Sequence, residues 1–122
     1  MKLIFFGLFL FGNVLALGQN NPDSIARAIE QAVSVEDKIE LLNTAANALK
    51  DADLKKSFDY ATQAHNLASQ AADQIGLAQA LLNLGNYYTR LGRHETAMEN
   101  YLKALEIGQQ QSDERLVGQT YK

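Results

Sequence analysis

The sequence contains no cysteine and no tryptophan, and its only proline is Pro22. The absence of cysteine excludes disulfide bonds, thiolate nucleophiles and zinc–thiolate sites. The formal charge is −3, so the chain lacks the basic excess that nucleic-acid binding requires. Apolar residues make up 47% of the 122 residues, which is enough for a packed core. After residue 22, alanine, leucine, glutamine and asparagine dominate, and this composition favours helices.

The first eighteen residues differ from the rest of the chain. Lys2 precedes an almost wholly apolar run from Leu3 to Leu17, and small residues stand at Ala16 and Gly18. This basic–apolar–small order is typical of a secretory signal peptide. The run is about fifteen residues long, shorter than the roughly 20 that span a bilayer. We therefore expect cleavage after Gly18, with an uncleaved membrane anchor as the alternative. In both cases the rest of the chain is exported, either periplasmic or membrane-tethered.

The remainder of the chain repeats with a period of forty residues. A shift by that period aligns several identical pairs, among them Leu42 with Leu82, Asn43 with Asn83, Ala64 with Ala104, Gln70 with Gln110, Asp73 with Asp113, and Gln79 with Gln119. A fixed period between 20 and 50 residues is typical of a solenoid, in which identical small units stack.

Apolar residues inside each unit recur at helical spacing. In the first unit the stripe is Val35, Ile39, Leu42, Ala46 and Leu49, and in the second it is Leu77, Leu81, Leu84, Gly85, Tyr88 and Leu91. In the second unit, Gly92 ends the first helix. In the first unit, Asp53 is placed to cap the second helix. Each unit is therefore predicted to be a helix, a tight turn and a second helix. A single pair cannot bury its apolar face, so neighbouring pairs must stack.

These patterns predict an all-α fold, an antiparallel helix-pair solenoid of about two repeats plus the start of a third. The predicted segments are a signal peptide at 1–18, a lead-in helix at 19–34, a degenerate first repeat at 35–74, a second repeat at 75–114, and the start of a third repeat at 115–122. Because the third unit ends early in its first helix, we expect a truncated reading frame or a fragment. A short cap at 115–122 is the alternative.

Residues 81–107 resemble a tetratricopeptide repeat. Seven residues carry the resemblance: Leu84, Gly85, Tyr88, Gly92, Ala97, Tyr101 and Ala104. It implies that Gly85 and Ala97 lie where the two helices cross closely, that Tyr88 and Tyr101 fill the space between units, and that Gly92 permits the turn. The first unit departs from this pattern, since Ala45, Ser57 and Ala61 replace the glycine, the first alanine and the aromatic residue. The period exceeds the common 34 residues, and we attribute the difference to a longer second helix and a connection around Gly108 to Asp113.

The resemblance also implies a concave groove lined by the first helix of each unit. Its positions are Ile39, Leu42, Ala46, Leu49 and Lys50 in the first unit, Gln79, Leu82, Asn86, Thr89 and Arg90 in the second, and Gln119 and Lys122 in the third. Asn86 and Arg90 are i, i+4 neighbours that could hold a peptide backbone or a carboxylate. The family's carboxylate clamp needs lysine and asparagine where Leu42 and Ala46 stand, so that clamp is not expected.

No residue pattern indicates catalysis, and we expect neither an enzyme nor a cofactor. His94 and Glu95 begin like a zinc-protease helix, but Met98 occupies the place of the second histidine. His65 has no partner ligand in the sequence, so no metal site is expected. The acidic pairs stand at helix starts, where carboxylates favour the helix dipole.

The leader followed by repeats resembles the exported sensor half of bacterial tetratricopeptide signalling proteins of the kind found in Bacteroidetes. In those proteins the repeats often precede a membrane helix and a histidine kinase or a DNA-binding domain. The resemblance implies an exported sensory or scaffold module whose groove binds a protein or peptide partner. Nucleic acid is not an expected partner, and membrane contact is expected only through the leader or a missing downstream segment. The alternative is a structural spacer or dimerisation arm that self-associates and has no ligand.

Overall fold

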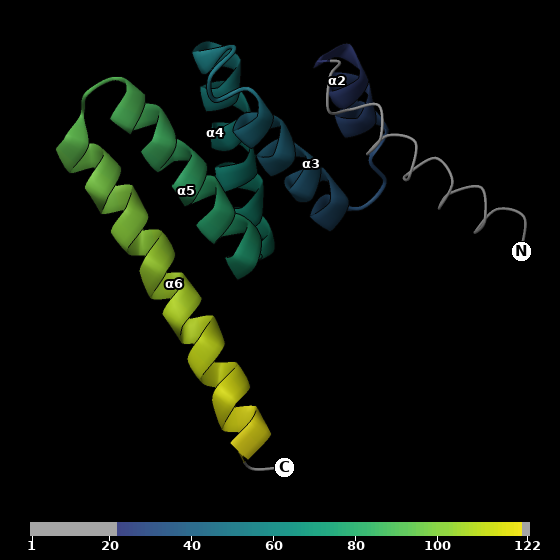
Figure 1. Ribbon diagram of the computed structural model, residues 1–122. Helices are drawn as coiled ribbons and strands as arrows, with labels where there is room; N and C mark the ends of the chain where they lie inside the picture. Colours follow the sequence, from purple (N-terminus) through teal and green to yellow (C-terminus); the bar gives the residue numbers. More distant parts are fainter. Residues whose placement is uncertain (1–21, 121–122) are drawn as a thin grey trace, which may run out of the picture.

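The computed structural model describes residues 22–120, and it describes side chains for residues 23–112. The predicted signal peptide at 1–18 lies outside the described residues. The described chain forms five helices (Figure 1): α2 (Pro22–Gln31), α3 (Val35–Ala48), α4 (Leu54–Ala71), α5 (Gln74–Arg90) and α6 (His94–Thr120). This part of the chain contains no strand, and the prediction of an all-α helical-repeat solenoid is confirmed. None of these helices is both long and apolar enough to cross a membrane.

Three of the helices have a short polar side chain at the N-cap position. The Ser34 hydroxyl accepts a hydrogen bond from the Asp37 amide at 3.1 Å, and Asp53 accepts one from the Lys56 amide at 3.1 Å. Asp73 caps α5 in the same way, through the Gly76 amide at 2.9 Å. Each cap satisfies an amide that has no partner within the first helical turn. The predicted capping role of Asp53 is confirmed.

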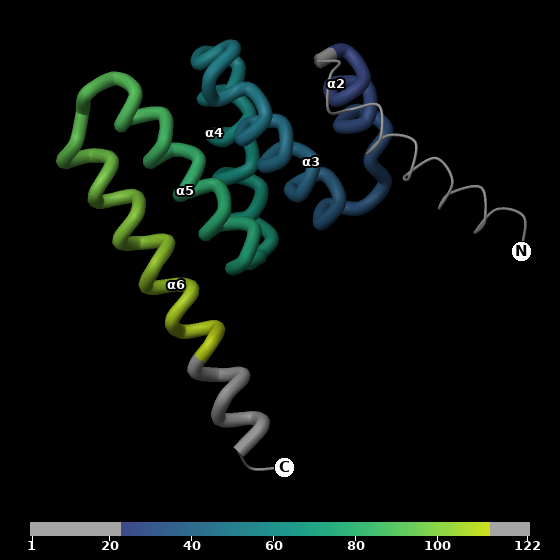
Figure 2. Tube along the Cα trace, in the orientation of Figure 1, coloured from purple at the N-terminus to yellow at the C-terminus, as the bar shows by residue number. Residues whose placement is uncertain are grey.

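The helices form two stacked hairpins. α3 packs on α4 and α5 packs on α6, while α4 lies against α5 and joins the two pairs. α3 also contacts α5 directly, and α2 covers the outer side of α3 (Figure 2). Among the described helices, α6 contacts α5 alone, so most of its circumference has no neighbour.

The core is small and rich in alanine. One cluster joins α2, α3, α4 and α5: Ile25, Ile29, Leu42, Ala45, Ala64 and Ala80. Ile39 and Leu42 are the only large side chains in the described part of the chain that are less than 2% exposed. Alanine at the other positions lets the helix axes approach closely, and the close approach keeps the interior dense.

The connection that we expected around Gly108 to Asp113 is wrong, because α6 continues as one helix through this segment to Thr120. The helix does lengthen as predicted, but no turn follows within the described backbone. A single glycine in a helix costs only about 1 kcal/mol relative to alanine, and the glutamines after Gly108 favour helix. The predicted start of a third repeat at 115–122 falls where side chains are not described, and it stays a prediction.

Candidate functional site

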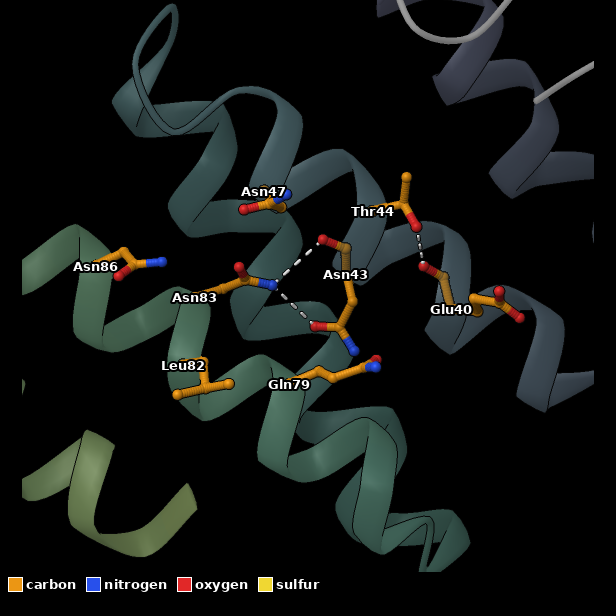
Figure 3. A pocket seen from close by; sticks show the side chains of 8 residues that line it. All are labelled: Glu40, Asn43, Thr44, Asn47, Gln79, Leu82, Asn83 and Asn86. Atoms are coloured by element: carbon orange, nitrogen blue, oxygen red, sulfur yellow. Dashed lines mark hydrogen bonds between the residues drawn. The ribbon is translucent and has the colours of Figure 1, made fainter. Parts of the chain in front are cut away.

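The described surface has a polar groove between α3 and α5, with a volume of about 370 Å³. Both helices contribute four residues to it, and the side chains of Asn43 and Asn83 meet across it (Figure 3). The lining residues are Glu40, Asn43, Thr44, Asn47, Gln79, Leu82, Asn83 and Asn86. We call this surface the α3–α5 groove. Five of its eight side chains are amides and one is a carboxylate, so it offers many hydrogen-bonding groups and a single charge.

Two asparagines close the floor of the groove. Asn43 and Asn83 are both buried and stand forty residues apart. The Asn83 side-chain nitrogen donates to the backbone oxygen and to the Oδ1 of Asn43, both at 3.2 Å. The Asn43 side-chain nitrogen donates in turn to the Gly76 backbone oxygen at 3.0 Å. A buried amide without partners would be costly, so these bonds fix both side chains and tie α3 to α5.

The fixed amides leave specific atoms open to the groove. Both bonds of Asn83 use its nitrogen, so its Oδ1 has no protein partner and points away from Asn43 (Figure 3). Asn86 has the opposite polarity, because its Oδ1 accepts a hydrogen bond from the Tyr101 hydroxyl at 2.7 Å and its nitrogen remains free. Asn47 and Gln79 make no side-chain hydrogen bonds among the described residues. The groove therefore presents both donors and acceptors to a ligand.

The predicted groove positions of the first unit are wrong for four residues. Ile39, Leu42, Ala46 and Leu49 are at most 8% exposed and belong to the core. Leu42 packs in the cluster that contains Ile25 and Ile29 of α2, and Ile39 lies against Gly76 of α5. The apolar stripe predicted for this helix is correct at these positions. The side of α3 that lines the groove instead carries Glu40, Asn43, Thr44 and Asn47.

The second unit places three predicted groove residues in the groove, namely Gln79, Leu82 and Asn86. Thr89 lies one turn further on, donates to the Gly85 backbone oxygen at 2.9 Å and does not line the groove. Arg90, at the end of α5, forms an ion pair with Asp51 in the α3–α4 turn. Lys50 lies half-buried in that same turn, also outside the lining. The cations that we assigned to the groove are therefore beyond its rim. The third-unit positions, Gln119 and Lys122, have no described side chains.

The residues predicted to pack the second unit lie at the contact between α5 and α6 and around it. Gly85 lies against the Tyr101 ring, and a Cβ atom on Gly85 would come within 2.5 Å of that ring. Tyr101 therefore packs within the second hairpin, and its predicted place between units stays a prediction, since the side chains of the third unit are not described. Tyr88 does meet the preceding unit, where its ring lies edge-on to Phe58 of α4 with 6.4 Å between centroids. The remaining predicted residues are Ala97 and Ala104, which are buried, Leu84, which is half-buried, and Gly92, whose φ is +75° in the turn.

A family model described as a tetratricopeptide repeat matches residues 37–110, which is more than half of the chain. The chain belongs to the tetratricopeptide repeat family. Repeats of this family generally mediate protein–protein interaction and are typically non-catalytic. No curated protein and no solved structure matches the chain. The match spans all of α4 and α5 and most of α3, so both walls of the α3–α5 groove belong to the repeat.

Sequence reasoning missed Glu40, Asn43, Thr44, Asn47 and Asn83 as lining residues. A signal for two of them was present, since Asn43 and Asn83 are identical across the repeat at positions surrounded by apolar residues. A polar residue that recurs at a buried position usually has a bonding role, because burial without a partner is unfavourable. Within the described residues, no three histidine or acidic side chains gather as a metal site would require.

A second hollow, mostly apolar, lies between α5 and α6. Its volume is about 380 Å³, and it is lined by Leu82, Tyr101, Ala104, Leu105, Gly108, Gln109 and Ser112. Leu82 belongs to both hollows, so the polar α3–α5 groove continues into this apolar one across a single side chain. An occupant of both would meet amides first and then aliphatic and aromatic carbon.

Proposed function

We propose that this chain is an exported interaction module whose α3–α5 groove binds an extended segment of a partner polypeptide. The observation that carries the proposal is the set of free amide atoms at Asn47, Gln79, Asn83 and Asn86 along one concave surface. An extended backbone presents N–H and C=O groups along its edge, and side-chain amides can satisfy both kinds of group. We also propose a sensory or scaffold role in a signal-transduction protein, which the leader and the repeats together support.

Site-specific photo-crosslinking in the producing cell tests this binding role. A photoreactive residue at Thr44, which is exposed and lines the groove, should form an adduct with a polypeptide partner. The same residue at Gln63, an exposed position on α4 away from the groove, serves as the control. Adding Asn86→Ala should abolish the Thr44 adduct. Equal adducts from both positions, or an adduct that Asn86→Ala leaves intact, would place binding elsewhere.

Export is part of the proposal and has its own test. Cleavage after Gly18 leaves a protein that begins at Gln19, and intact mass spectrometry of the exported fraction measures this directly. We expect the mass of residues 19–122. A protein that retains Met1 and sediments with membranes would contradict cleavage and support the anchor instead.

A structural spacer or dimerisation arm is the second candidate, and an exposed apolar stripe on α6 favours it. Met98, Leu102 and Leu105 stand at i, i+4 and i+7 on this helix, and each is more than half exposed. Such a stripe is typical of a face that packs against another helix. Sedimentation velocity of the parent and of the double variant Leu102→Gln, Leu105→Gln tests it. The spacer candidate predicts a parent dimer that dissociates in the variant, whereas a monomeric parent would contradict it.

A further inference from the structure

The α3–α5 groove has a polarity that selects among polypeptide segments. Its lining contains one charged side chain, Glu40, and no lysine, arginine or histidine. Arg90, one of the two cations that we predicted for the groove, is paired with Asp51 outside it. A carboxylate that left water for this groove would therefore find amide donors but no opposite charge, and burying an unpaired charge is unfavourable. The carboxyl terminus of a partner is thus a poor ligand.

Two neighbouring amides on α5 are fixed with opposite polarity. Asn83 presents its Oδ1 because its nitrogen is held by Asn43, and Asn86 presents its nitrogen because its Oδ1 is held by Tyr101. Residues three apart on a helix stand about 5–6 Å apart at Cβ. An acceptor and a donor at that spacing can bond the N–H and C=O groups along one edge of an extended chain, which repeat about every 6.6 Å.

The charge of the groove lies at one end. Glu40 is exposed, its carboxylate has no partner among the described residues, and it stands at the opposite end of the groove from Asn86 (Figure 3). The Thr44 hydroxyl bonds the Glu40 backbone oxygen at 2.8 Å and leaves the carboxylate free. A lysine or arginine of a bound segment would find its opposite charge there and nowhere else in the lining.

We infer that the groove takes an internal, extended segment of polypeptide with a lysine or arginine next to Glu40, held by Asn83 and Asn86 through its backbone. This inference rests on the proposed function and names its ligand class. The backbone contacts tolerate many sequences, while Glu40 selects one position by charge. A free carboxyl terminus adds nothing to binding.

The test uses the full chain and a positional-scanning library of acetylated, amidated octapeptides, repeated with the same peptides carrying a free carboxyl terminus. We expect selection of lysine or arginine at one position and equal binding with either terminus. Glu40→Gln should weaken the selected peptides about two- to fivefold, the size of an exposed ion pair, and flatten that preference. Glu36→Gln, one turn earlier on α3 and outside the lining, is the matched control. It should change neither the affinity for the selected peptides nor the preference for lysine or arginine.

Asn86→Ala should weaken all selected peptides roughly ten- to a hundredfold, because it leaves a peptide carbonyl without its donor. Asn66→Ala, an exposed asparagine on α4, is the control, and circular dichroism of both variants checks the fold. Peptides that bind only with a free carboxyl terminus, or that carry acidic residues at the selected position, would overturn the inference and leave the proposed function standing. No selected peptide, or binding indifferent to Asn86→Ala, would overturn both.

Discussion

At the scale of single residues, the two buried asparagines join structure and function. Asn43 and Asn83 fix one another and hold Gly76, so α3 and α5 keep the spacing that opens the groove. The same bonds decide which atom of Asn83 faces a ligand. A buried hydrogen-bonded pair contributes little net stability when intact and costs much more when one partner is removed.

This asymmetry predicts strong coupling in a double-mutant cycle. Asn83→Leu should destabilise the chain by about 1–3 kcal/mol, because it leaves the polar atoms of Asn43 without their partner. Adding Asn43→Leu should cost less than the sum of the two single changes, since the partners then leave together. Urea unfolding monitored by circular dichroism measures all four proteins. Strictly additive costs would show that the two amides act independently.

Gly85 and Gly108 provide a matched pair of alanine substitutions on the two helices of one hairpin. Gly85→Ala should destabilise by about 1–3 kcal/mol, because the Tyr101 ring blocks the new methyl and cannot move without losing its bond to Asn86. A Cβ placed on Gly108 would meet no other part of the described chain within 4 Å, so Gly108→Ala should stabilise by about 0.5–1 kcal/mol. Thermal unfolding of the two variants measures both effects. A Gly85→Ala variant as stable as the parent would contradict the close contact between Gly85 and Tyr101.

Residues that pack a repeat were easier to predict than residues that line its groove. Small residues such as Gly85 and Ala97 recur because the two helices of a unit cross closely there, and their small size can be read directly from the sequence. For α3 the apolar stripe was predicted correctly except at Val35, which is 46% exposed, but the four buried residues of the stripe were also assigned to the groove by register. The sequence does not show that α2 covers Leu42, and this contact decides which side of α3 remains open.

At the scale of elements, the ends of the helices follow local rules. Ser34, Asp53 and Asp73 cap three helices, and left-handed residues end two of them. Gly92 has φ of +75° and Ala72 has φ of +55°. Alanine rarely adopts this conformation because its Cβ approaches the backbone, whereas glycine adopts it freely. The C-terminal end of α5 thus has a favourable residue in Gly92, whereas the C-terminal end of α4 has a strained one in Ala72.

Exchange of glycine and alanine at these two helix ends should change the free energy of unfolding in opposite directions. Ala72→Gly should stabilise the chain by about 1 kcal/mol, and Gly92→Ala should destabilise it by about 1 kcal/mol. No atom lies within 4 Å of a Cβ placed on Gly92, so the effect there is conformational and not a clash. Chemical unfolding of both variants gives the two signs, and equal signs would refute the assigned backbone conformations.

The length of α6 shows the limit of prediction for elements. The period of forty residues indicated extra residues in the second half of the unit, and the helix is indeed long. Where it ends could not be predicted, because Gly108 signals a stop but the helix continues through it, and Gln109, Gln110 and Gln111 suit a helix. A helix without a local stop ends where tertiary contacts decide, and such contacts are invisible in sequence.

At the scale of the whole molecule, stacked hairpins produce a curved surface that neither hairpin has alone. The α3–α5 groove exists only because the first helices of successive pairs lie side by side, held by α4 behind them. The helical class and the repeat family were predictable from periodicity, since stacking is the only way to bury these apolar stripes. The polarity of the groove required the bonds of Asn83 and Asn86, which depend on partners up to forty residues away.

The central claim is that the free side-chain amides of the α3–α5 groove bind an extended segment of polypeptide. Nitrogen–proton NMR spectra of the full chain resolve side-chain amide signals, so titration with the tightest peptide of the library tests the claim without any mutation. We predict shifts for Asn47, Gln79 and Asn86 in the groove and unchanged signals for Gln63 and Asn66 on α4. Shifts confined to the α4 amides, or unchanged groove signals at saturating peptide, would contradict the claim.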